Sequence, residues 1–417
     1  NATYSLIGNH TDEMMNKRNT ASLYEPVGAS TDNKSAVRNH RDYIQLKADY
    51  TLPFGNDCKL EAGLLGESVS KTTSFLYTDF DPAAGQWITD TLLTNDIGFT
   101  QAILAGYTTL GGKLWNIEWQ AGLRMEWYSR TLDQKTTKTR YPMDMINFFP
   151  TFRLTKTLPA GQDLQLAYSR RVNRPDDRLL NPFSYFSDAF TTQSGNPHLK
   201  PEFIDSYELN YEKNFKWGNL TAETYYRHTH DVVSTNMVMV SPVKLWLYPE
   251  NFGNDYTLGL DLGGNITLFK WWKLVPGVSL SNYTQEATLD DVNYHTNNNL
   301  LNARLTTTFI IHDNTRLQVN ASYNSPYKLI EGDFASFYTV SASARQDFLR
   351  KKLSLTVTAG DIFQTGYSYF DNRKQSFRVY GAYYPEAPVV MLTVSYKLND
   401  FKPRQKNQGP SNLDSGI

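Results

Sequence analysis

Apolar side chains recur at every second residue over runs of about ten residues, and this period of two predicts long β-strands. The runs include 117–127, 207–211, 256–268, 301–309, 315–324 and 389–398. In the first run, Leu123 and Met125 flank Arg124, so apolar and polar side chains fall on opposite sides of the strand. No segment shows a comparable helical period. Each predicted strand therefore has one apolar face and one strongly polar face.

Two architectures produce this alternation. A β-sandwich buries the apolar faces in a shared core, whereas an outer-membrane barrel turns them toward lipid and the polar faces toward its lumen. Sandwich strands usually have about five or six residues, whereas strands that cross a membrane need about 9–11. The runs in this chain are of the longer kind, which favours the barrel.

The lengths of the connections separate the two architectures further. Short polar turns are predicted at Pro53–Lys59, Gly111–Lys113, Pro159–Gln162, Lys216–Gly218, Lys270–Trp271, His312–Asn314 and Arg350–Lys352. Long connections are predicted near 71–96, 129–144, 172–202, 229–252, 286–296, 325–334 and 364–388. Short periplasmic turns that alternate with long extracellular loops are typical of bacterial barrels. The sequence thus predicts an all-β, antiparallel, up-and-down transmembrane barrel.

The predicted strands can be counted from these turns. Seven hairpins, a final strand at 389–398 and a first strand at 2–8 bring the total to about sixteen. Residues 1–398 are predicted to form the barrel. Residues 399–417 are polar and carry Pro403 and Pro410, so we expect a disordered periplasmic tail.

The amino-acid composition is compatible with a barrel, because the polar faces of the strands lower the mean hydropathy of the chain. The net charge of −1 across 417 residues argues against binding to nucleic acid. The mean hydropathy of −0.50 resembles that of a soluble protein. No run of about 18 apolar residues predicts a transmembrane helix, but barrel strands give a much weaker hydropathy signal. Aromatic residues make up 14% of the chain, as suits β-structure.

The centre of the chain carries a more specific motif. Residues 166–174 read Leu-Ala-Tyr-Ser-Arg-Arg-Val-Asn-Arg, and 195–202 read Gly-Asn-Pro-His-Leu-Lys-Pro-Glu. The motif resembles the barrel of TonB-dependent outer-membrane receptors, in which such a loop precedes a strand. Asn181-Pro182-Phe183 and the Tyr-Ser-Arg-Arg run look like the Bacteroidota branch, and 353–367 look like the family's penultimate strand and the loop after it.

The resemblance implies active uptake of a nutrient such as a glycan, siderophore, haem, vitamin or peptide, through the outer membrane of a Gram-negative cell. Family barrels have about 22 strands and enclose a plug, which carries the segment that contacts TonB. Because the sequence begins directly at the predicted strand 2–8, we expect this chain to be the C-terminal part of such a barrel. Its expected partners are outer-membrane lipid, the missing plug and strands of the same protein, and the TonB complex through that plug. A surface lipoprotein is a further candidate.

Two other classes of function remain open. One is a passive porin-like or adhesive barrel, and the other is a soluble β-sandwich that binds a ligand. Neither requires a plug or a TonB complex. The upstream reading frame and detergent dependence would separate the three.

The motif loop has a structural interpretation of its own. Pro197 and Pro201 lack an N–H group and fix φ, and Gly195 permits a turn, so the loop suits the entry to a strand at 203–215. We expect this role rather than ligand contact. Its residues are Gly195, Asn196, Pro197, Leu199, Lys200, Pro201 and Glu202.

Two sets of residues are candidates for contact with a plug or a substrate. The alternation predicts a charged lumen wall, on which both signs of charge could position a plug or tune selectivity. This wall includes Glu67, Arg124, Glu126, Arg171, Glu208, Arg227, Arg304 and Arg345. Aromatic rings in the long connections could stack on a ligand or pack the loops together. These rings are Trp87, Tyr185, Phe186, Trp246, Tyr248, Tyr327 and Tyr369.

No pattern in the chain predicts catalysis or a resident cofactor. Phosphate-binding loops, nucleophile elbows and metalloprotease helices are missing from the sequence. His228 and His230 project to one side of a strand, but no further ligand is identifiable. Asp176-Asp177 and Asp290-Asp291 fall in predicted loops and are interpreted as solvated acids.

Overall fold

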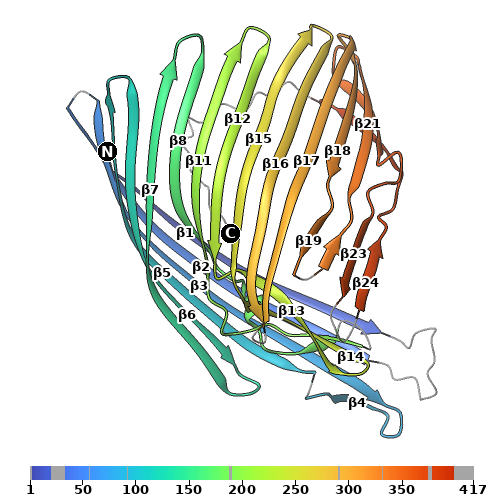
Figure 1. The fold of residues 1–417 in the computed structure, drawn as a ribbon. Coiled ribbons are helices and arrows are strands. Elements are labelled where there is room, and N and C mark those ends of the chain that lie inside the picture. Colours follow the sequence, from blue (N-terminus) through green and yellow to red (C-terminus); the bar gives the residue numbers. More distant parts are fainter. Residues whose placement is uncertain are drawn as a thin grey trace. The chain divides into compact units, whose positions relative to one another are not determined.

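The computed structural model describes residues 2–19, 33–55, 57–91, 93–186, 190–289, 292–330, 332–373 and 378–398, with the backbone alone for 2–19, Tyr185, Phe186, Leu289 and Arg373. The chain forms two compact units, and Figure 1 labels their strands. The first unit comprises Asn1–Arg153, Arg174–Pro201 and Val233–Asn251. The second comprises Leu154–Asn173, Glu202–Val232 and Phe252–Ile417.

The first unit consists of long antiparallel strands and of folded connections. The long strands are β1 (Ala2–Asn19), β2 (Asn33–Phe54), β3 (Cys58–Asp81), β5 (Asn95–Leu114), β6 (Ile117–Gln134) and most of β7 (Thr139–Leu158). The short β4 (Gln86–Thr89) pairs with the end of β3. The connections contain α1 (Asp177–Leu180), β9 (Tyr185–Phe186), β10 (Thr191–Gln193), β13 (Val233–Ser241) and β14 (Lys244–Asn251). Strands β13, β14, β10 and β9 form a separate four-stranded sheet, in which β10 and β14 run parallel.

The second unit continues the up-and-down pattern. Its long strands are β8 (Gln162–Asn173), β11 (Glu202–Phe215), β12 (Gly218–His230), β15 (Asn254–Phe269), β16 (Trp272–Leu289), β17 (Val292–His312), β18 (Thr315–Asn324), β21 (Phe337–Phe348), β22 (Leu353–Gly360) and β25 (Val389–Tyr396). Each pairs in antiparallel fashion with the next strand in this order. A second four-stranded sheet is formed by β19 (Tyr327–Leu329), β20 (Gly332–Phe334), β23 (Ser368–Arg373) and β24 (Arg378–Tyr383).

The number of strands agrees with the sequence-based prediction. Within the described residues, the main sheet has 17 strands. Sixteen of them are long, and the remaining one is the four-residue β4. This confirms the prediction of about sixteen strands. In the described parts of the chain, α1 is the one helix, and it has four residues. No helix there has the length and apolar character needed to cross a membrane.

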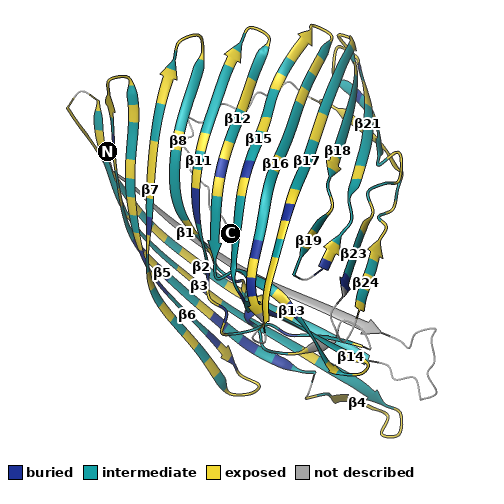
Figure 2. Ribbon diagram, viewed as in Figure 1, coloured by how far each residue is buried: buried dark blue, intermediate teal, exposed yellow. Residues whose placement is uncertain are grey.

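The apolar faces of the strands are exposed rather than packed in a core. In β6, Leu123 and Met125 are 47% and 46% exposed, whereas Glu126 and Tyr128 on the opposite face are 5% and 0% exposed. Figure 2 shows such alternation along many strands. The two buried hydrophobic clusters of the described residues involve the connections, around Leu180 in one unit and Phe252 in the other. A sandwich would bury its apolar faces between two sheets, so that alternative is excluded.

Six of the seven predicted short turns are confirmed, and one was placed too early. Strand β5 runs through Gly111 and Gly112, and the turn falls at Trp115 and Asn116, both at positive φ. A side chain on Gly112 would come within 2.9 Å of the Cys58 Sγ atom and 3.2 Å of the Trp119 ring. The glycine therefore permits close packing inside the strand instead of forming a turn.

Three predicted long connections were wrong in whole or in part. Residues 129–144 are mostly the ends of β6 and β7, 286–296 are mostly the ends of β16 and β17, and β3 continues to Asp81 within 71–96. The outer parts of these strands contain many polar residues, so their sequence resembles that of a loop while the backbone pairing continues. The predicted connections at 172–202, 229–252, 325–334 and 364–388 are confirmed. The predicted tail at 399–417 and the pair Asp290-Asp291 lie outside the described residues.

Candidate functional site

The connection between β8 and β11 is docked on the polar face of the first unit's strands. Leu180 and Leu199 are both 0% exposed, and they pack against Ile97, Phe99 and Leu132 of β5 and β6. Leu199 is itself a residue of the motif, so this part of the motif lies on the same face. The described parts of the connection 174–201 therefore form a folded element of the first unit rather than a solvated loop.

A buried arginine holds the motif loop in place. The Arg130 side chain is 2% exposed. Its Nη2 atom donates to the carbonyl oxygen of Pro197 at 3.1 Å and to that of Leu199. Its Nη1 atom has no partner among the described protein groups. Because a buried guanidinium must be hydrogen-bonded to be tolerated, these two carbonyls determine where the loop sits.

Ion pairs tie the start of the connection to the same face. The Glu126 carboxylate is buried and accepts hydrogen bonds from Arg124, at 2.5 Å, and from Arg174 at the beginning of the connection. Lys71 of β3 lies 2.6 Å from Asp177 in α1. Partly buried pairs are less weakened by solvent than surface pairs, so they add to the anchoring provided by Arg130.

The helix α1 begins at an acidic cap. The Asp176 carboxylate accepts hydrogen bonds from the N–H groups of Arg178 and Leu179 at 3.0 and 2.9 Å. Burial raises the pKa of Asp176, but the hydrogen bonds from Leu179 and Arg178 outweigh burial and hold its pKa below the ordinary value. The carboxylate is therefore stabilised in its charged form, as expected at a helix N-terminus.

The motif itself is fixed by its backbone. The Gly195 N–H group donates to the Asn181 carbonyl oxygen, and the Asn196 N–H group to that of Leu179, both at 2.7 Å. A Cβ atom on Gly195 would lie 2.5 Å from the Leu179 oxygen, so only glycine fits. The Asn196 side chain donates to the carbonyl oxygen of Pro249 at 3.1 Å. The Lys200 backbone is paired in both directions with the side chain of Asn251.

The remaining motif residues lead into strand β11. Pro201 is buried, and the Lys200 side chain is exposed. Glu202 is the first residue of β11 and accepts a hydrogen bond from Asn173 at 2.6 Å.

The loop sheet of the first unit presents a stacked aromatic pair. Trp246 and Tyr248 of β14 have ring centroids 4.3 Å apart. The Trp246 Nε1 atom donates to Ser194 at 2.9 Å, and the Tyr248 hydroxyl accepts from Asn236 at 3.1 Å. Both polar tips are therefore satisfied within the protein, which orients the rings and leaves them half-buried.

The loop sheet of the second unit carries an aromatic ladder. Tyr327, Phe334 and Phe370 stand opposite one another on β19, β20 and β23. Their rings stack at 4.6 and 6.1 Å. On β24, Gly381 stands opposite Phe370, and a Cβ atom added to this glycine would lie 3.3 Å from the Phe370 ring. The ring of Phe370 thus covers the glycine of the edge strand.

The other predicted loop aromatics are placed as follows. Trp87 packs against Phe80 at 5.3 Å and lies 3.7 Å below the Lys34 ammonium group. Tyr369 is half-buried in β23. Tyr185 and Phe186 form β9, but their side chains lie outside the described part of the chain.

Most predicted wall residues are engaged by their neighbours on the polar faces. In the second unit, Glu208 accepts from Ser206 at 2.8 Å, and Arg227 lies 4.0 Å from the Tyr225 ring. Arg345 donates to Asp347 and to Ser354, both at 2.9 Å. Arg171 and Arg304 are exposed. In the first unit, Glu67 accepts hydrogen bonds from Tyr43 at 3.2 Å and from Gln45 at 3.4 Å.

Sequence reasoning missed the residues that anchor the connection, chiefly Arg130, Arg174 and Lys71. One signal was present, because the alternation of Arg124 and Glu126 continues through Tyr128 to Arg130. It was obscured because 129–144 was interpreted as a long loop.

The paired histidines do not form a metal site. The rings of His228 and His230 lie 3.7 Å apart, and the His230 Nε2 atom is 3.2 Å from the Asp205 carboxylate. Among the residues described, no group of three or more His, Cys, Asp or Glu side chains is arranged to hold a metal ion.

Long antiparallel strands with one exposed apolar face and one polar face are the structure that a transmembrane β-barrel requires. The chain is of this class, and it is a protein of the Gram-negative outer membrane. It belongs to the outer membrane protein beta-barrel family, whose model matches residues 1–396. Among characterised protein sequences no significant match was found.

Solved structures share this fold at low sequence identity. The ferric yersiniabactin uptake receptor FyuA from Yersinia pestis is 13% identical, with a TM-score of 0.60 over 92% of this chain and 57% of the receptor. The copper transporter OprC is 13% identical, with a TM-score of 0.60 over 89% of this chain and 62% of the transporter. The ferric citrate transporter FecA is 12% identical, with a TM-score of 0.60 over 92% of this chain and 60% of the transporter. The chain thus spans about 57–62% of the length of these proteins.

Proposed function

We propose that this chain is the barrel portion of a TonB-dependent importer, of the Bacteroidota type, that takes up a scarce nutrient through the outer membrane. Its folded connections capture the substrate, and a plug drawn by the TonB complex opens the way through the lumen. A surface lipoprotein that delivers the substrate is a further proposed partner. The chain is not proposed to catalyse a reaction.

The observation that carries this proposal is the contrast between the two ends of the strands. One end has short turns, whereas the other carries the docked connection and two additional four-stranded sheets. Connections built as folded layers can hold side chains in fixed positions for recognition. A passive pore has less need of such preorganised surfaces.

Two groups of side chains receive proposed roles. Trp246, Tyr248 and Tyr327 would contact the substrate, because their rings are stacked and oriented. The charged groups of the polar faces would line the lumen and pair with the plug. Those groups are Glu67, Arg124, Glu126, Arg171, Glu208, Arg227, Arg304 and Arg345.

The substrate class is tested first with metal complexes, because the structurally similar proteins are a ferric yersiniabactin receptor, a copper transporter and a ferric citrate transporter. Haem, vitamins, peptides and glycans follow. Uptake of each labelled compound would be measured in cells that express the full gene product carrying this chain, with TonB present or deleted. We expect accumulation of one compound that disappears without TonB or after addition of a protonophore.

The same cells distinguish the alternative. Uptake that persists without TonB and follows the concentration gradient would indicate a passive channel and would contradict the proposal. Replacement of Trp246 and Tyr248 by alanine tests the capture surface, and we expect weaker substrate binding at unchanged surface abundance. Trp115→Ala is the matched control, because Trp115 is 87% exposed in a short turn.

A further inference from the structure

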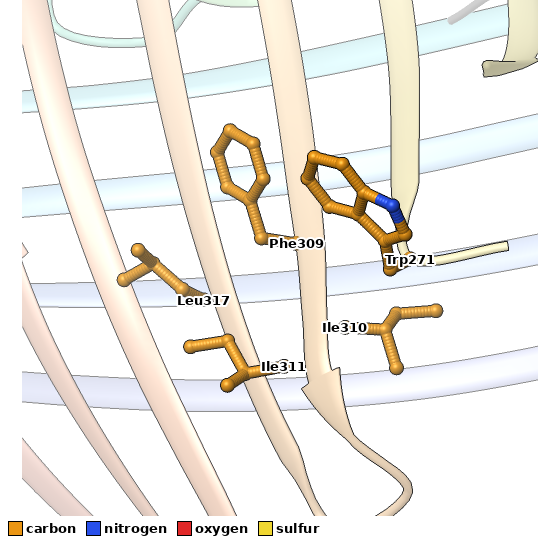
Figure 3. A pocket seen from close by; sticks show the side chains of 5 residues that line it. All are labelled: Trp271, Phe309, Ile310, Ile311 and Leu317. Carbon is orange, nitrogen blue, oxygen red and sulfur yellow. The ribbon is translucent and has the colours of Figure 1, made fainter. Parts of the chain in front are cut away.

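An apolar groove lies at the short-turn edge of the second unit. Its lining residues are Trp271, Phe309, Ile310, Ile311 and Leu317 (Figure 3). Its volume is about 500 Å³. Trp271 is 51% and Ile311 66% exposed, so the groove is open to its surroundings. The volume falls within the range of about 300–1,000 Å³ in which small molecules bind.

The groove has an ordered aromatic wall. The rings of Trp271 and Trp272 stack at 5.9 Å, and those of Trp272 and Phe309 at 5.7 Å, with Phe269 stacked on Trp271 at 5.5 Å. The Ile310 N–H group donates to the Trp271 carbonyl oxygen at 2.8 Å. This hydrogen bond fixes the turn between β15 and β16 against the end of β17.

The groove is continuous with the lipid-facing surface. Phe309 stands opposite Trp272 on one side and Leu317 on the other, so the three side chains share a face. Two residues further along on that face, Thr307 pairs with Val319, and Leu305 and Tyr323 beyond them are 40% and 38% exposed. Since this face is the apolar one, an occupant of the groove comes from the membrane.

The turn that contains Trp271 is basic, and further basic turns lie along the same edge, whereas the turn between β17 and β18 carries Asp313. Hydrogen bonds of 2.7 and 2.8 Å to the carbonyl oxygens of Trp217, Trp271 and Asn314 join successive turns to neighbouring strands, which places the turns along one edge (Figure 1). The basic residues in the turns of the second unit are all exposed, and Asp313 is the one described acidic residue among them. They are Lys216, Lys270, Arg350, Lys351 and Lys352.

We propose that this groove binds an acyl chain of an anionic phospholipid from the periplasmic leaflet. Short turns of bacterial barrels face the periplasm, so the groove opens at the depth of that leaflet. Aromatic rings at the interface contact the upper part of the chain. Lys270, next to Trp271 in the turn, lies at the level of the lipid phosphate, and Lys216 in the turn between β11 and β12 extends this attraction.

The first experiment tests the groove. The full gene product is reconstituted in phosphatidylcholine vesicles that contain a small fraction of brominated phosphatidylglycerol, and quenching of tryptophan fluorescence is measured. The difference between the wild type and Trp271→Phe isolates the signal of Trp271. We expect this signal to be quenched about fivefold more effectively by brominated phosphatidylglycerol than by brominated phosphatidylcholine, the ratio that corresponds to about 1 kcal/mol for one basic residue near the phosphate.

The second experiment tests the headgroup contact. Lys270→Gln should remove most of the preference for phosphatidylglycerol. Lys113→Gln is the matched control, because Lys113 lies at a short-turn end in the first unit and pairs with Glu118 at 4.0 Å. That substitution should leave the preference unchanged. Each variant is first shown to be folded by its β-sheet circular dichroism.

Three results would overturn the inference. Equal quenching by the two brominated lipids would show that the groove does not select an anionic headgroup. An equal effect of both lysine substitutions would indicate diffuse attraction to the protein surface. If Trp271→Cys instead cross-links two barrels in high yield, the occupant of the groove is a second copy of this chain. Phe309→Ser provides an independent readout, because it should abolish retention of phosphatidylglycerol in native mass spectrometry of a folded barrel.

Discussion

Arg130 bears a positive charge at a position where 2% of its side chain is exposed, and it uses that charge to hold two carbonyl oxygens of the motif loop. We expect Arg130→Met to leave the oxygens of Pro197 and Leu199 without their donor. Each buried unsatisfied group costs about 1–3 kcal/mol, so the docked connection should open at least tenfold more often. Limited proteolysis within 174–201 in outer-membrane vesicles measures this opening.

Arg178→Met is the control for Arg130. Arg178 also carries an ion pair, with Asp176 at 3.0 Å, but its side chain is 86% exposed. Exposed pairs contribute roughly 0–1 kcal/mol, so cleavage should hardly change. Equal protease sensitivity of the two variants would show that Arg130 does not anchor the loop.

Asp176 gives the docked connection a dependence on pH. The folded-state pKa of this carboxyl lies below the ordinary value of 3.8, so its contribution is complete above that value and is lost as the pH falls through the folded pKa. The cap is half-exposed, and we expect it to contribute at most about 1 kcal/mol. Protection of 174–201 should therefore decline below about pH 4.

Asp176→Asn separates the cap from its charge. Asparagine caps helices about as well as aspartate, so protection at neutral pH should remain while the decline at low pH disappears. The measurement is proteolysis with an acid-active protease between pH 2.5 and 6. An unchanged acid response in this variant would assign the effect to other carboxyl groups.

Single residues show what one sequence can and cannot reveal. The alternation placed Arg124 and Glu126 on the polar face of β6, as found. It could not reveal that Arg174, 48 positions from Glu126, completes the ion pair, since that contact depends on how a long connection folds back. The proline and glycine residues of the motif did indicate a rigid entry to a strand, because their backbone limits act locally.

At the scale of elements, the loop sheet of the second unit depends on its aromatic ladder. Phe334 stacks on both Tyr327 and Phe370, and each stacked pair contributes about 0.5–1.5 kcal/mol beyond burial. We expect Phe334→Leu to speed hydrogen exchange of the β20 and β23 amides about tenfold. Mass spectrometry of the exchanged peptides reports it.

Tyr380→Leu serves as the comparison in the same sheet. Tyr380 lies on the edge strand β24 and is 67% exposed, so its loss should alter exchange little. If the two variants exchange at the same rate, the ladder does not hold the sheet together.

Strand boundaries could be predicted where contact with lipid imposes an alternation of apolar and polar residues. They could not be predicted where this alternation is absent. Turns such as that at Lys270–Trp271 interrupt a strict alternation and were located from the sequence. The outer parts of β6, β7, β16 and β17 are rich in polar residues, and such segments resemble loops. Their pairing arises from backbone hydrogen bonds, which leave no period in the side chains.

At the scale of the whole molecule, the exposed apolar belt is the property that places the chain in a membrane. Val319 and Gln318 are neighbours in β18, and Val319 lies on the belt face with Leu317, whereas Gln318 lies on the polar face. An arginine that faces lipid at the bilayer midplane costs about 2–4 kcal/mol. We expect Val319→Arg to lower the free energy of unfolding by this amount and Gln318→Arg to have little effect.

Urea unfolding of the reconstituted chain measures both variants at the same depth in the bilayer. The pair differs only in the face that carries the charge. Similar destabilisation by the two substitutions would mean that the belt face is not in contact with lipid.

The paired ends of β16 and β17 have a consequence at the cell surface. Register pairs continue from Asn282 and Asn299 to Leu289 and Val292, which extends the hairpin by roughly 25 Å along its axis beyond the apolar belt. An antibody or a phage that approaches the cell would meet this rigid hairpin. Because its pairing depends on the backbone, many of its side chains are free to vary without loss of the fold, and surface variants that escape recognition should accumulate there.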